Sequence, residues 1–159
     1  MRFEKDIVFY VNDTIVEKIN NCIKLASPNE ANGYILGNIQ EVNNNGDFNY
    51  NYSSLSFHCI DSTKGSEISF FLDNEQKMLE LNAQINNENL KLIAILHSHP
   101  AGTNPSSTDK HNMKYYHNSG LKKFTHLIWI IVDSRNNKMK GFIYLNNKLT
   151  QIKLIVGNY

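Results

Sequence analysis

The stretch AILHSHPAGTNPSSTDKHNM, residues 94–113, begins as an apolar strand and then places two histidines one residue apart, directly before a proline. Alternate residues of a strand point to the same face, so His97 and His99 are expected to project together, with Ser98 on the opposite face. Pro100 cannot continue the hydrogen-bond ladder, so the chain leaves the sheet there. The two imidazoles are therefore expected to converge at a strand end, beside a loop.

A second set of polar residues follows this loop. Pro105 and Ser106 open a predicted helix over residues 107–118, and Asp109 lies in its first turn. Ser106 and Asp109 have the spacing of a capping box, which by itself would explain both residues. His97, His99 and Asp109 also form a three-ligand set with an open fourth position, as a hydrolytic zinc ion requires. The two roles can coexist.

Composition and charge limit the classes of function. The chain has 159 residues, of which 41% are hydrophobic, and we predict one domain over residues 1–159. Sixteen basic and fifteen acidic residues are scattered, so neither a nucleic-acid nor a membrane partner is expected. Cys22 and Cys59 are far apart and form no CxxC motif, which favours free thiols in a reducing compartment. Because residues 1–11 do not resemble a signal peptide and no apolar run could span a membrane, we predict a cytoplasmic protein.

Hydrophobic periodicity predicts a mixed α/β fold, with a central β-sheet flanked by about three helices. A capping box of Thr14 and Glu17 is expected to open the first helix, and Asp73 to cap the second, whose apolar side would include Leu79. Asparagine clusters mark the turns. The predicted strands cover residues 3–11, 33–40, 48–60, 68–71, 90–99, 124–132, 138–145 and 149–156.

The stretch His97-Ser-His-Pro100, followed by Pro105-Ser-Ser-Thr-Asp109, resembles the JAMM motif of the MPN-domain (JAB) zinc metallopeptidases, whose pattern is HxHP, a short loop and SxxD. That family also has a glutamate in an E-x-x-G stretch after the first helix, and Glu30-Ala-Asn-Gly33 matches it here. The element order suits an MPN (JAB)-like fold of the compact prokaryotic type. The interval between His99 and Asp109 is one residue shorter than in the family pattern.

The resemblance implies a role for each matching residue. His97, His99 and Asp109 would hold one Zn²⁺ per chain, Glu30 would be the general base, and Ser106 would donate a hydrogen bond to the developing oxyanion. The implied activity is hydrolysis of peptide or isopeptide bonds at the C-terminal tail of a ubiquitin-like or sulfur-carrier protein. By position alone, Glu30 would more often be a solvated loop residue.

Two other functions remain open from the sequence. The first is a metal-binding or inactive MPN scaffold that acts through protein partners. The second is a DNA-repair-associated role, because the RadC proteins have a similar HxHPxG motif, although the scattered charges disfavour it. A zinc deaminase is disfavoured because its HxE and PCxxC elements are missing.

Overall fold

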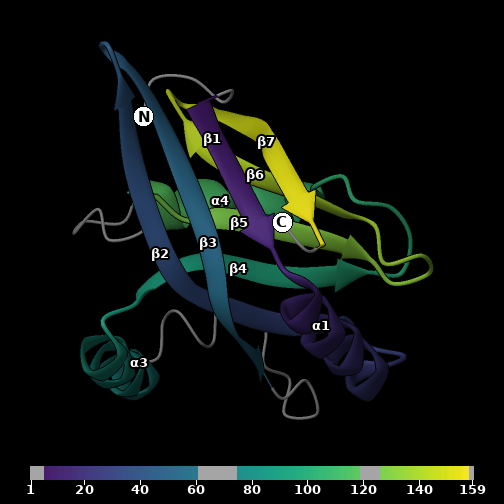
Figure 1. Cartoon of the computed structure of the whole chain (residues 1–159). Helices are drawn as coiled ribbons and strands as arrows, with labels where there is room; N and C mark the ends of the chain where they lie inside the picture. The colour runs from purple at the N-terminus through teal and green to yellow at the C-terminus, as the bar shows by residue number, and fades with distance from the viewer. Residues whose placement is uncertain (1–5, 61–74, 119–125, 158–159) are drawn as a thin grey trace.

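The computed structural model describes residues 6–60, 75–118 and 126–157. Three helices and seven strands lie in these ranges, which confirms the mixed α/β class (Figure 1). In chain order the elements are β1 (Ile7–Val11), α1 (Asp13–Ala26), β2 (Asn32–Asn44), β3 (Asp47–Ile60), α3 (Glu75–Glu88), β4 (Lys91–His99), α4 (Ser107–Asn118), β5 (Ile128–Asp133), β6 (Met139–Leu145) and β7 (Lys148–Val156).

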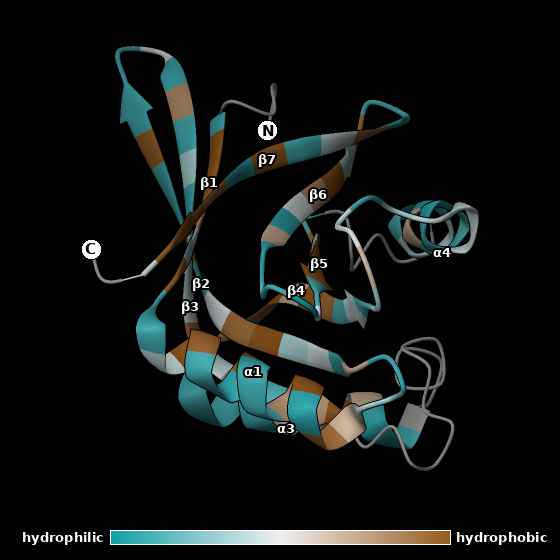
Figure 2. Cartoon of the chain, turned by 90° about the vertical axis from the view of Figure 1, so that its right-hand side faces the viewer, coloured by the Kyte–Doolittle hydropathy of each residue, from teal (hydrophilic) through white to brown (hydrophobic). Residues whose placement is uncertain are grey.

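The sheet closes into a barrel in the order β1-β3-β2-β4-β5-β6-β7. The first strand completes the closure, because β1 pairs in parallel with both β3 and β7. The sequence pattern predicts a central sheet but not its closure into a barrel. Figure 2 shows α1 and α3 below the barrel and α4 on a different side.

A long hairpin joins β2 and β3 and projects from the barrel (Figure 1). Its turn residues, Asn45 and Gly46, have φ values of 55° and 90°, the left-handed conformations that a tight hairpin turn requires. Asparagine and glycine tolerate these conformations better than other residues do. Both strands therefore extend beyond the predicted ranges of 33–40 and 48–60.

Strand β4 lies at the centre of the sheet, between β2 and β5, and is buried on both faces. Ala94 and Leu96 contribute to the core beneath α1, whereas Ile95 belongs to a second core that also contains Met113 and Tyr116 of α4. Because alternate residues of a strand share a face, His97 and His99 lie on the same face of β4 as Ile95, and Ser98 lies on the opposite face. The two histidines are thus directed toward the side of β4 that α4 covers.

Helix α1 begins two residues earlier than the capping box of Thr14 and Glu17 predicts. Its N-cap is Asn12, whose side-chain oxygen accepts a hydrogen bond of 3.0 Å from the Ile15 amide. The prediction of a capping box formed by Thr14 and Glu17 is wrong, because both residues lie inside the helix. Asparagine is as good an N-cap as serine and outranks threonine, so Asn12 was the better candidate.

Cys22 of α1 and Cys59 of β3 form a disulfide, with their Cα atoms 5.6 Å apart. The prediction of free thiols is therefore wrong. A separation of 37 residues in sequence concealed the contact, which arises because α1 folds back against β3. Because the two cysteines are bonded to each other, they no longer support the prediction of a reducing compartment.

Some predictions fall outside the described residues. The strand at 68–71, the cap at Asp73 and the beginning of the strand at 124–132 belong to this group.

Helix α3 buries Leu81, but Leu79 is 58% exposed, so its predicted place on the apolar side is wrong. None of the helices in the described ranges is long and apolar enough to cross a membrane.

Candidate metal centre

The candidate ligands come from the end of β4 and the first turn of α4. His97 is the last buried residue on its side of the strand, and His99 is only partly buried. Pro100 follows the end of the strand, as predicted, and the chain then loops back to α4. Asp109 stands at the third position of that helix, which brings its carboxylate over the two imidazoles.

The three side chains converge, so that the Nε2 atoms of both imidazoles and the two carboxylate oxygens of Asp109 lie close together. The Nε2 atoms of His97 and His99 lie 3.0 Å apart. Each Nε2 is 3.1 Å from an oxygen of Asp109, Oδ1 for His97 and Oδ2 for His99. This is the arrangement that the HxHP and SxxD motifs predicted.

These distances fit a metal ion. Donor atoms at 2.0–2.1 Å from a tetrahedral zinc ion are separated from each other by about 3.3 Å. The observed separations of 3.0–3.1 Å are close to that value. Two imidazole nitrogens and a carboxylate oxygen are also ligands that zinc commonly takes, with a fourth position left for water or substrate. His97, His99 and Asp109 could therefore hold one metal ion.

A capping box fixes the orientation of Asp109. The Asp109 amide donates to the Ser106 hydroxyl over 3.1 Å, and the Ser106 amide donates to Asp109 Oδ2 over 2.7 Å. Burial raises the pKa of the Asp109 carboxyl, but hydrogen bonding to His97 and to the Ser106 amide outweighs it, so the pKa lies well below its ordinary value. The carboxylate is thus ionised and already oriented for a cation.

Ser106→Ala is expected to lower the free energy of unfolding by about 1 kcal/mol, because the Asp109 amide loses its cap. Ser106→Gly should lower it by only a few tenths of a kcal/mol, since glycine is tolerated at an N-cap. Urea denaturation of the metal-free variants measures both changes. Equal stability of Ser106→Ala and the parent protein would show that the hydroxyl does not cap α4.

Glu30 lies in the segment between α1 and β2 and lines the same cavity as the three candidate ligands. This cavity has a volume of about 490 Å³, and Ser106 also lines it. Within the described part of the chain, no hydrogen bond or ion pair holds the Glu30 side chain, which is exposed. All five predicted site residues are thus brought to one cavity, and their chemical roles stay predictions.

The glycine of the Glu30-x-x-Gly33 stretch is required by close packing between β2 and β3. A Cβ atom at Gly33 would lie 2.5 Å from the Phe57 ring and 2.8 Å from the His58 carbonyl oxygen. Any larger residue would push β2 away from β3. The glycine therefore keeps the beginning of β2 close to its neighbour, just after Glu30.

The sequence did not indicate that two asparagines would also line the cavity. Asn32 is directly opposite His97 in the pairing of β2 with β4, and Asn112 lies one helical turn after Asp109. The i to i+3 spacing from Asp109 could have identified Asn112. His111, two residues after Asp109, is exposed and does not line the cavity.

The loop after His99 is held by the end of β5, which the sequence did not indicate. The Gly102 amide donates to Asp133 Oδ2 over 2.8 Å, and Arg135 donates to both oxygens of the same carboxylate. The Ser134 amide and hydroxyl both donate to the His99 carbonyl, over 3.0 and 2.9 Å. Hydrogen bonds from Arg135 and Gly102 hold the pKa of Asp133 well below its ordinary value.

The stability of the metal-free protein should depend on Asp133 at acid pH. Because the folded-state pKa is depressed, the carboxylate contributes stability that is fully present above its ordinary pKa of 3.8 and is lost as the pH falls through the folded-state value. Asp133→Asn should therefore be less stable than the parent at pH 7, and this difference should shrink below pH 3.8. Urea midpoints from pH 7 to 2 measure it.

The matched control for Asp133→Asn is Glu41→Gln, which removes an exposed carboxylate from the outer part of β2. This variant should follow the parent at every pH. A difference between Asp133→Asn and the parent that does not change with pH would contradict the ionised contact with Arg135 and Gly102.

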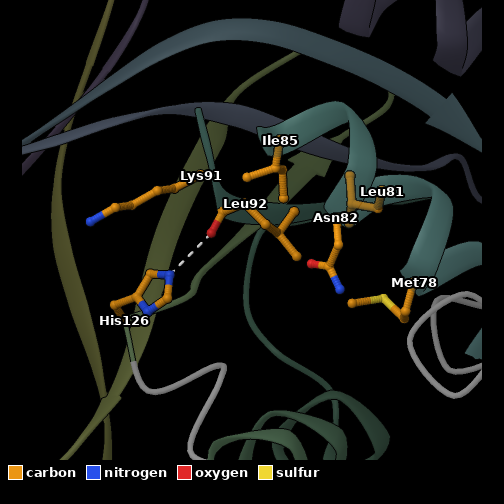
Figure 3. A pocket seen from close by; sticks show the side chains of 7 residues that line it. All are labelled: Met78, Leu81, Asn82, Ile85, Lys91, Leu92 and His126. Atoms are coloured by element: carbon orange, nitrogen blue, oxygen red, sulfur yellow. Dashed lines mark hydrogen bonds between the residues drawn. The ribbon is translucent and has the colours of Figure 1, made fainter. Parts of the chain in front are cut away.

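A second cavity, of about 300 Å³, lies at the other end of β4, between α3 and the beginning of β5 (Figure 3). Its lining is mainly apolar and includes Leu81, Ile85 and Leu92. His126 lies at one side and contacts the Leu92 carbonyl oxygen over 3.1 Å (Figure 3). Burial and the nearby Lys91 lower the pKa of His126, and its bond to Leu92 opposes them. Among the described residues that line this cavity there is no carboxylate.

The comparisons with known proteins agree with the motif. The family described as prokaryotic homologs of the JAB domain matches residues 13–143, which include all five residues of the candidate site. The chain belongs to this family. The match thus runs from α1 into β6, and β1 and β7 complete the barrel from either side of the matched region.

The fold of this prokaryotic JAB domain also resembles a solved structure, the solution structure of protein DSY2949 from Desulfitobacterium hafniense. The two chains are 18% identical, with a TM-score of 0.66, and the match covers 96% of this chain and 94% of the other. At this identity the likeness concerns the fold alone. No curated protein matches the chain significantly.

Proposed function

We propose that the protein is a zinc-dependent hydrolase that cleaves peptide or isopeptide bonds at the C-terminal tail of a ubiquitin-like protein. The family includes peptidases as well as inactive scaffolds, so membership alone does not decide between them. The observation that carries the proposal is the convergence of His97, His99 and Asp109, with Glu30 and Ser106 lining the same cavity. An inactive scaffold has no need of all five residues.

Zinc is the metal that we propose for this donor set. Two imidazole nitrogens and one carboxylate oxygen suit it, and the remaining position can accept water or substrate. When bound, zinc would lower the pKa of a water molecule to about 7 and polarise the scissile carbonyl. One carboxylate among the ligands leaves the site with a net positive charge, which favours a developing oxyanion.

The remaining residues account for the proton transfers. The Glu30 carboxylate takes a proton from the attacking water, whose oxygen forms a bond to the scissile carbonyl carbon. The Ser106 hydroxyl donates a hydrogen bond to the carbonyl oxygen as negative charge develops on it. Glu30 then gives the proton to the departing amine as the carbon–nitrogen bond breaks, so that one water molecule is consumed for each bond cleaved.

The closed barrel limits how a tail would bind. Extended peptides commonly bind by adding a strand to a free sheet edge. However, β4 is paired on both sides, with β2 and β5, so the strand that carries the histidines has no free edge. A tail would instead lie across the cavity of about 490 Å³. Glycines beside the scissile bond would let its backbone approach the metal without steric conflict.

The experiment uses two series of synthetic tails, each joined to a lysine side chain. One series ends in Gly-Gly, and in the other the glycines are replaced by valine. Zinc-loaded protein should release the amine from the Gly-Gly series, and a zinc chelator should abolish the release. Equal cleavage of both series, or cleavage that survives chelation, would contradict the proposal. Zinc binding without cleavage of any tail would favour a scaffold that acts through partners.

The Ser106 variants test the donor role separately from the cap. If the hydroxyl stabilises the oxyanion, Ser106→Gly should lose up to about 10³-fold in kcat while keeping nearly all of its stability. Ser106→Ala should lose turnover to the same extent. Normal specific activity of folded Ser106→Gly would leave Ser106 with its capping role alone.

A further inference from the structure

We propose that Ser98 is a positioning residue, which holds the Glu30 segment at a fixed place relative to the two histidines. Ser98 stands between the histidines on β4, but its side chain points to the opposite face of the strand. It is buried, with 2% of its surface exposed. It therefore cannot contact a substrate, and it acts through the residues that it binds. This proposal rests on the base role of Glu30 in the proposed function.

Ser98 is joined to Ala31 by two hydrogen bonds. The Ala31 amide donates to the Ser98 hydroxyl over 2.8 Å, and the Ser98 amide donates to the Ala31 carbonyl oxygen over 2.9 Å. Ala31 is completely buried and precedes the first residue of β2. The hydroxyl therefore adds a contact just beyond the regular pairing of β2 with β4, which begins at Asn32 and His97.

This contact matters for Glu30 because, among the described residues, only backbone contacts hold the segment that contains it. No hydrogen bond or ion pair of its side chain is found in residues 6–60, 75–118 and 126–157. Its neighbours are anchored on both sides: the Asn29 amide donates to the Ala26 carbonyl over 2.9 Å, and Ala31 is bound to Ser98. The bond between Ala31 and Ser98 therefore connects the Glu30 segment to β4, the strand that carries the two histidines.

A loss of this anchor should affect catalysis more than metal binding. A shift of about 1 Å in a catalytic group can cost 10²-fold in rate. The histidines remain fixed by the pairing of β4 with β2 and β5, whereas Glu30 loses the side-chain bond that ties its segment to them. The expected signature is a lower kcat with an unchanged metal site.

The test compares Ser98→Ala with Ser98→Thr, which keeps the hydroxyl. The matched control is Ser54→Ala, because Ser54 is equally buried and donates to a backbone carbonyl, that of Tyr10, over 2.7 Å, away from the candidate site. Each variant is measured for kcat and KM on the Gly-Gly tail, for the visible absorption spectrum of the Co²⁺ form, and for amide hydrogen exchange over residues 29–32.

Ser98→Ala should lose about 10²-fold in kcat, with KM and the Co²⁺ spectrum unchanged and faster exchange over residues 29–32. Ser98→Thr should restore most of the turnover, and Ser54→Ala should show neither change. A kcat within twofold of the parent, an altered Co²⁺ spectrum, or exchange no faster than in Ser54→Ala would overturn the proposal. If the parent itself cleaves no tail, the proposed function fails, and the exchange and Co²⁺ measurements alone decide whether Ser98 fixes this segment.

Discussion

Glu30→Gln is expected to lower kcat by about 10²–10⁴-fold, the contribution typical of a general acid–base residue. Glutamine has nearly the same size and shape as glutamate but cannot take up a proton at neutral pH. Because Glu30 is exposed and is not one of the three converging ligands, its replacement should leave both the fold and the zinc content unchanged. Turnover of the Gly-Gly tail, with zinc measured by elemental analysis, provides the comparison.

The control for Glu30→Gln is Glu17→Gln, an exposed glutamate on α1 that does not line the cavity. This variant should keep the activity of the parent. If Glu30→Gln retained full turnover with zinc bound, Glu30 would not be the base. Loss of zinc from the same variant would instead mean that Glu30 contributes to the metal site.

His97→Ala is expected to abolish zinc retention, together with turnover. Protein purified without added zinc should contain one ion per chain in the parent and close to none in the variant. The physical reason is that His97 contributes one of three donors, and its Nε2 lies 3.0–3.1 Å from both other ligands. With two donors left, the set no longer matches any common structural or catalytic zinc site.

His111→Ala is the matched control for His97→Ala, because His111 is an exposed histidine two residues after Asp109 and lies outside the cavity lining. It should retain one ion per chain and normal turnover. Absence of zinc from the parent, combined with unchanged activity of His97→Ala, would show that the three residues are not a metal centre.

Strand β4 and helix α4 are among the elements predicted most accurately from the sequence: the predicted ranges 90–99 and 107–118 correspond to Lys91–His99 and Ser107–Asn118. The apolar run of β4 ends in His-x-His-Pro, and local rules suffice for this pattern: residue alternation along a strand places the imidazoles together, and proline ends the ladder. The capping box of Ser106 and Asp109 is likewise a contact within one helical turn. Candidate ligands could be identified because their geometry depends on neighbours in sequence.

Contacts between distant segments could not be predicted in this way. The disulfide between Cys22 and Cys59, and the bond from Gly102 to Asp133, join residues separated by 37 and 31 positions. Closure of the barrel by β1 and β7 is of the same kind. Such contacts depend on how the elements pack together, which the periodicity of any single element does not reveal.

Asp109 Oδ2 is shared between the first turn of α4 and the candidate metal site, since it accepts from the Ser106 amide and lies 3.1 Å from His99. The carboxylate is therefore immobilised when the protein folds, and an arriving cation encounters a rigid receptor and loses little affinity to the freezing of this side chain. The shared oxygen also makes the candidate metal site depend on the first turn of α4. Fraying of one helical turn would release a candidate ligand, so local opening of α4 would shorten the lifetime of an ion bound there.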